Sequence, residues 1–162
     1  VWENCLWLVE QEGLEPNVEV LQVAAWFHDL ERGSEEHGFL RNVLKDVGAD
    51  NGFTEKVIGV INEHSFGKKQ SSLESRILYD ADKLQYLYIE RVMAILKAYD
   101  EGLTMPKKTL GEYIQSWRKR ITGVKGSFHF ECTKARFKED LKEVSSFVKT
   151  VPELAGFLDG MI

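Results

Sequence analysis

Cysteine, long apolar runs and excess positive charge are all scarce in this sequence. Only two of its 162 residues are cysteine, which excludes a disulfide framework and predicts a reducing, cytoplasmic setting. No stretch approaches the roughly 18 consecutive apolar residues of a membrane-spanning helix, so no membrane partner is expected. Lys and Arg number 21 against 26 Asp and Glu, and this formal net charge of −5 argues against nucleic acid as the main partner.

Alternating apolar and polar residues, the pattern of a β-strand, are also missing. Apolar residues instead recur at the three- and four-residue spacing of amphipathic helices. We therefore predict a single all-α domain over residues 1–162 with about six to eight helices, a metal site within 1–91 and a C-terminal helical extension over 108–160. The expected helices cover residues 1–12, 17–30, 35–47, 54–64, 71–101, 108–121 and 133–149, with a short piece after Pro152.

Three polar residues continue or interrupt the apolar faces of these expected helices. His28 and His64 each extend an apolar stripe, and Asp82 lies beside Leu78 and Ala81. Taken singly, each histidine is more simply a hydrogen-bonded core residue, and Asp82 an ion-pair partner of a nearby cation. Taken together with Asp29, they favour a divalent metal site, because imidazole nitrogens and carboxylate oxygens are its usual ligands. The stripes comprise Leu21, Ala24 and Ala25 before His28, and Val57, Val60 and Ile61 before His64.

At these residues the chain resembles the HD superfamily of metal-dependent phosphohydrolases. The matching segments are LQVAAWFHDLERG, VIGVINEHSFG and SSLESRILYDADKLQYLYIERV. The last two look like a branch of small, stand-alone bacterial HD proteins. In the family pattern, a histidine, a His-Asp dyad and a distant aspartate surround one metal, and here His28-Asp29 match the dyad and Asp82 the distant aspartate.

The resemblance implies a divalent cofactor, which the sequence narrows only to Mn, Mg, Fe, Co, Ni or Zn. His28, Asp29 and Asp82 are the expected ligands, and His64 and His37 stand where extended variants add histidines. For His37 a solvated position in the first turn of a helix is an equal alternative. Asp29 and His64 are also expected to take part in catalysis.

The substrate expected from the resemblance is a small phosphorylated molecule, with a nucleotide as one candidate. Arg32 and Lys83, which adjoin predicted ligands, are the cations expected to meet its phosphate. The family's first histidine would lie just upstream of Val1, and we expect the natural protein to have further residues before Val1. A catalytically impaired HD domain that binds a nucleotide or metal is the alternative function, and a plain helical domain is a third. The oligomeric state stays open, with a homo-oligomer as one alternative.

Overall fold

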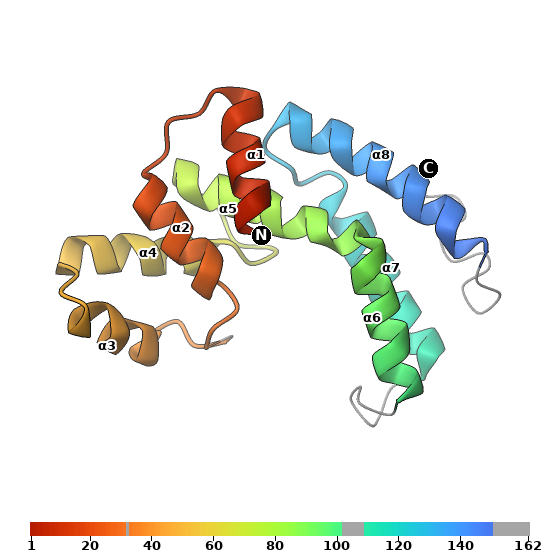
Figure 1. Cartoon of the computed structure of the whole chain (residues 1–162), viewed down its shortest axis with the longest axis horizontal. Helices are drawn as coiled ribbons and strands as arrows, with labels where there is room; N and C mark the ends of the chain where they lie inside the picture. The colour runs from red at the N-terminus through yellow and green to blue at the C-terminus, as the bar shows by residue number, and fades with distance from the viewer. Residues whose placement is uncertain (32, 102–108, 151–162) are drawn as a thin grey trace. The chain divides into compact units, whose positions relative to one another are not determined.

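The computed structural model describes residues 1–31, 33–101 and 109–150 (Figure 1). Within these ranges the chain forms eight α-helices, one 3-10 turn and no strand, which confirms the predicted all-α class. The chain divides into two compact units, Val1–Asp82 and Lys83–Ile162, and the boundary falls inside a helix. The elements are α1 (Trp2–Glu12), α2 (Val18–Phe27), α3 (Gly38–Asp46), α4 (Asn51–Glu63), α5 (Leu73–Leu84), η1 (Gln85–Leu87), α6 (Ile89–Asp100), α7 (Leu110–Val124) and α8 (Glu131–Val148).

Short polar residues and glycine set the ends of the helices in the first unit. Helix α1 ends at Gly13, whose φ of 59° is a left-handed conformation that glycine adopts without steric cost. Asn17 caps α2, because its side chain accepts a hydrogen bond from the Val20 amide at 3.1 Å. The predicted start of α4 at Thr54 was wrong, since Asp50 accepts from the Phe53 amide at 2.8 Å and begins the helix earlier.

Helix α3 begins later than the predicted residue 35. The residue before it, His37, has a left-handed backbone with φ of 49°, and its side chain does not cap the helix. The Glu31 carboxylate takes that role from outside the helix, accepting hydrogen bonds from the Phe39 and Leu40 amides at 3.0 Å each. The first turn of α3 is thereby tied to the segment that follows α2.

The core of the first unit lies where α2 packs against α4 (Figure 1). Helix α1 contacts α2, and α3 contacts α4. Helix α5 joins through α1, because the buried Asn4 side chain donates to the Ala81 carbonyl at 3.0 Å. The fully buried large side chains of this unit are Leu8, Val20, Leu21, Leu40, Val57, Ile77 and Leu78.

The predicted continuous helix over 71–101 was wrong. Helix α5 ends at Leu84, the short η1 follows, and Tyr88 takes an extended conformation with ψ of 123° before α6 begins. A contact distant in sequence accompanies the break: the indole nitrogen of Trp117 on α7 donates to the Tyr86 carbonyl at 2.9 Å. The short piece expected after Pro152 lies outside the described residues.

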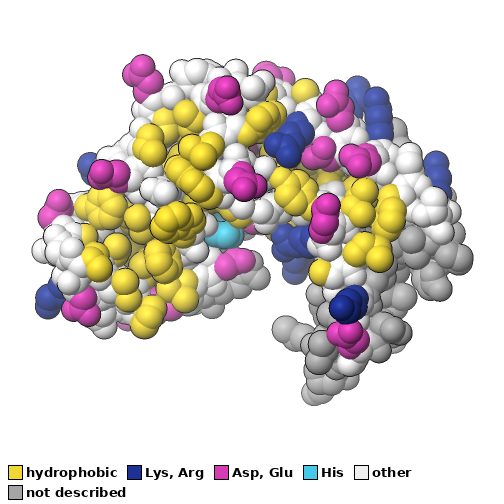
Figure 2. Space-filling model, viewed as in Figure 1, with side chains coloured by type: hydrophobic (Ala, Val, Ile, Leu, Met, Phe, Trp, Pro, Cys, Tyr) yellow, Lys and Arg dark blue, Asp and Glu magenta, His cyan; other side chains and the backbone are white. Residues whose placement is uncertain are grey.

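Large hydrophobic side chains also lie on the surface of the first unit. Figure 2 shows hydrophobic side chains gathered on the face of this unit that is in view. None of the described helices is long and apolar enough to span a bilayer. The exposed large hydrophobic residues of this unit are Leu6, Val18, Trp26, Phe39, Val47 and Phe66.

Candidate metal centre

The His28-Asp29 dyad lies at the C-terminal end of α2, which ends at Phe27 rather than at the predicted residue 30. His28 is the C-cap residue, and its ring Nδ1 lies 2.9 Å from the Ala25 carbonyl oxygen. A carbonyl oxygen only accepts hydrogen bonds, so Nδ1 carries the proton. This bond fixes the ring and presents Nε2 as its second nitrogen, which is the usual arrangement of a metal-ligating histidine.

Two carboxylates approach Nε2 of His28. The Oδ2 atom of Asp29 and the Oδ1 atom of Asp82 each lie 3.7 Å from it. Asp82 comes from α5 and is buried, whereas the Asp29 side chain is 55% exposed. The structure therefore brings together three residues that the sequence predicted as ligands, one of them about fifty positions from the dyad in the chain.

His64 repeats the arrangement of His28 on the neighbouring helix. It is the C-cap residue of α4, and its Nδ1 donates to the Ile61 carbonyl three residues earlier. The two imidazole rings lie edge to face, with 5.3 Å between their centroids and an angle of 89° between their planes. Both predicted histidines thus meet at one end of the α2–α4 pair, with the same nitrogen anchored to backbone.

The electrostatics of this cluster favour a cation. Burial alone would lower the pKa of His28, but the Asp82 carboxylate, the Ala25 carbonyl and Asp29 outweigh it and raise that pKa. Cys5 lies in the same negative field, and burial, with a smaller contribution from Asp82, raises the pKa of its thiol to about 12. A positive charge, whether a proton on His28 or a bound ion, is therefore stabilised here.

The donor set suits a divalent metal, although the side chains are not closed around one. Among the described residues, no group of three or more His, Cys, Asp or Glu side chains is placed to hold a metal ion. The chemistry nevertheless fits, because His28 offers a backbone-anchored imidazole and Asp29 and Asp82 offer carboxylate oxygens. We therefore treat His28, Asp29, Asp82 and His64 as the candidate metal centre.

The remaining predicted site residues have other surroundings. His37 is buried, so the alternative of a solvated first-turn residue was wrong, and its Nε2 lies 3.0 Å from the Asn62 side-chain oxygen. Lys83 is the first residue of the second unit, and its ammonium lies 5.5 Å from the centroid of the Tyr86 ring. Arg32 lies outside the described residues. Roles for these three in metal binding or catalysis stay predictions.

Sequence reasoning missed Asn62 and Glu31, which shape the surroundings of the centre. Asn62 contacts His37 and also donates to the Glu35 carbonyl at 3.0 Å, and Glu31 caps α3. The one signal for Asn62 was its position two residues before His64 in the INEH segment. No local pattern could reveal Glu31 as a cap, because it lies eight residues before the first amide that it accepts.

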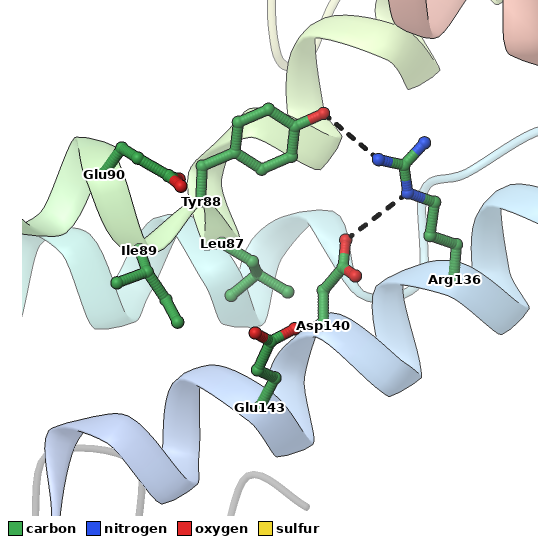
Figure 3. A pocket seen from close by; sticks show the side chains of 7 residues that line it. All are labelled: Leu87, Tyr88, Ile89, Glu90, Arg136, Asp140 and Glu143. Atoms are coloured by element: carbon green, nitrogen blue, oxygen red, sulfur yellow. Dashed lines mark hydrogen bonds and ion pairs between the residues drawn. The ribbon is translucent and has the colours of Figure 1, made fainter.

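The second unit has a cavity of its own, of about 310 Å³ (Figure 3). Arg136 organises it, donating to the Tyr88 hydroxyl at 3.3 Å and lying 3.7 Å from the Asp140 carboxylate. Burial raises the pKa of Asp140, with Arg136 opposing and neighbouring glutamates adding to the effect. No histidine lines this cavity, so it lacks the donor set of the first unit. Its lining residues are Leu87, Tyr88, Ile89, Glu90, Arg136, Asp140 and Glu143.

An all-α fold with a histidine–carboxylate cluster at a helix end defines the class of protein, and the comparison with known families identifies it. The model of the HD domain family matches residues 1–87, which is more than half of the chain and includes the whole candidate centre. The chain belongs to the HD domain family. No curated protein and no solved structure gave a significant match.

Proposed function

We propose that this protein is a metal-dependent phosphohydrolase acting on a small phosphorylated substrate such as a nucleotide. The observation that carries the proposal is the convergence of the Asp29 and Asp82 carboxylates on the backbone-anchored ring of His28. Family membership supports it, because HD domains are typically metal-dependent phosphohydrolases.

His28, Asp29 and Asp82 would hold the divalent ion. When bound, such an ion lowers the pKa of a coordinated water and polarises a phosphoryl oxygen. Asp29 is the exposed member of the set, so its carboxylate is suited to orient the attacking water and accept its proton. His64 is proposed either to bind a second metal ion or to contact a phosphate oxygen. Arg32 and Lys83 are proposed to neutralise the charge of the substrate.

Metal content and turnover together test this proposal. The purified protein is assayed with Mn, Mg, Fe, Co, Ni or Zn on p-nitrophenyl phosphate and a panel of nucleotides. His28→Ala and Asp82→Ala should each lower kcat/KM on the order of 100-fold, because each removes a proposed ligand. His129→Ala, at an exposed histidine of the second unit, is the matched control and should leave turnover unchanged. Full activity in either ligand variant would rule out the site.

A catalytically impaired HD domain that acts as a nucleotide- or metal-binding regulatory module is the second candidate. It is supported by the distances of 3.7 Å between His28 and the two carboxylates, because these side chains are not closed around a catalytic metal ion. Titration calorimetry with metal and nucleotide separates the two functions. Binding without turnover under every metal would support the regulatory module.

A further inference from the structure

The side-chain amide of Asn62 connects α4 to the segment before α3. Its Nδ2 lies 3.0 Å from the Glu35 carbonyl oxygen, and its Oδ1 lies 3.0 Å from Nε2 of His37. A backbone carbonyl only accepts hydrogen bonds, so the nitrogen of the amide must face Glu35 and its oxygen must face His37. The His37 ring therefore donates through a protonated Nε2, and that nitrogen has no lone pair left for a metal.

The contact holds His37 in a conformation that its own residue type disfavours. Its φ of 49° is left-handed, which costs a residue with a Cβ and persists only where surrounding contacts fix it. His37 is buried, with 3% of its surface exposed, and its backbone amide donates to the Ser34 hydroxyl at 3.3 Å. Asn62 and Ser34 thus supply the contacts that hold His37 in place.

These contacts tie together the two segments that carry the candidate metal centre. The segment after α2 begins with His28-Asp29 and ends at His37, and Asn62 lies in the last turn of α4, two residues before His64. The Glu31 carboxylate fixes the same segment to the start of α3. Loss of the Asn62 hydrogen bonds would remove contacts that hold Glu35 and His37, which follow the dyad in the chain, against α4.

We propose that Asn62 and His37 are positioning residues, which hold the dyad segment in register with His64, and that Nε2 of His37 is not a metal ligand. The inference rests on the proposed phosphohydrolase function and gives His37 a role different from the ligand role that the resemblance implies. It predicts that the two residues act as a single unit. Removing either partner should have nearly the same effect as removing both.

A double-mutant cycle on Asn62→Leu and His37→Leu tests this prediction. Each single variant should lower kcat by roughly tenfold or more, with KM changed less, because misplacing reacting groups lowers the rate more than substrate binding. The double variant should lose no more than either single variant. His37→Gln keeps an amide donor toward Asn62 and should recover part of the lost rate while retaining the bound metal.

Glu55→Gln provides the matched control at the same α3–α4 contact. It removes the carboxylate that pairs with Arg41 on the protein surface, and it should leave kcat unchanged. Thermal unfolding of each variant shows whether it is folded at the assay temperature. If Asn62→Leu does not fold, Asn62→Ala, which also removes both the acceptor for His37 and the donor to Glu35, replaces it in the cycle.

One further readout tests the inference without relying on rates. The imidazole ¹⁵N spectrum should show the His37 ring protonated at Nε2, and Asn62→Leu should change that signal. Additive losses in the cycle, normal kcat in folded Asn62→Leu, or loss of metal in His37→Gln would each overturn the positioning role. Absence of turnover in the native protein with every metal would instead overturn the proposed function on which the inference rests.

Discussion

At the scale of single residues, the two cysteines differ in how deeply they are buried. Burial raises the pKa of Cys5 to about 12, whereas Cys132 is half-buried. Because the thiolate is the reactive form, iodoacetamide should modify Cys132 in the native protein while Cys5 stays protected until the first unit unfolds. Peptide mass spectrometry after timed alkylation measures both rates. Equal modification of the two cysteines without denaturant would contradict the buried position of Cys5 in α1.

The histidines at the ends of α2 and α4 could be predicted, because helical periodicity alone places His28 and His64 on inward faces. Asp82 could be predicted for the same reason, and the structure brings its carboxylate to 3.7 Å from His28. The surroundings of His37 could not be predicted. Its contact with Asn62 depends on a left-handed backbone and on a residue 25 positions away in the sequence. Periodicity carries no information about such a contact.

At the scale of elements, Glu63 joins the last turn of α4 to the start of α5. Burial alone would raise its pKa, but hydrogen bonds from Ser71 and the residues after it outweigh this effect and lower the pKa. Its carboxylate accepts from the Ser71 amide at 2.7 Å and from the Ser71 hydroxyl at 2.5 Å. The junction between the two helices therefore depends on an ionised carboxylate.

Glu63→Gln should lower the free energy of unfolding by about 1–3 kcal/mol near neutral pH, because the charge and one of the two acceptor oxygens are lost. A lowered folded pKa means that the stabilisation is present above the ordinary glutamate pKa and is lost as the pH falls through the folded value. The variant and the native protein should therefore converge in stability in acid. Urea denaturation at several pH values measures this difference, and a gap that widens in acid would contradict the assignment.

Helix ends set by local chemistry could be predicted, whereas ends set by distant contacts could not. Gly13 and Asn17 favour helix ends by their residue type, and the structure has them at the end of α1 and the start of α2, at the boundaries of the predicted ranges 1–12 and 17–30. The break after α5 contains no glycine or proline that would predict it, and the helical spacing of apolar residues continues through Tyr88. The contact that accompanies it, from Trp117 to the Tyr86 carbonyl, comes from 31 residues away in the chain.

At the scale of the whole molecule, the two compact units have separate sets of buried side chains. Leu21 is 1% exposed in the first unit, and Phe137 is 3% exposed in the second. Leu21→Ala should cost about 2–5 kcal/mol and Phe137→Ala about 3–5 kcal/mol through lost burial and cavity formation. We expect each substitution to speed amide hydrogen exchange mainly within its own unit.

Hydrogen exchange followed by mass spectrometry makes this comparison directly. Equal loss of protection across both units from either substitution would show one cooperative structure over the described chain. That result would favour the predicted single domain over residues 1–162, which the family match, confined to residues 1–87, leaves untested.

The ends of α2 and α4 have a consequence for the order in which ligands bind. Both helices present their C-terminal carbonyls at the candidate centre, since His28 and His64 are their C-cap residues. Each such end carries roughly half a negative charge, and the carboxyl groups of Asp29 and Asp82 lie beside them. In the proposed function, a phosphate ester approaching this end before a cation would be repelled. In that function, the cation would therefore bind first and the anionic substrate second.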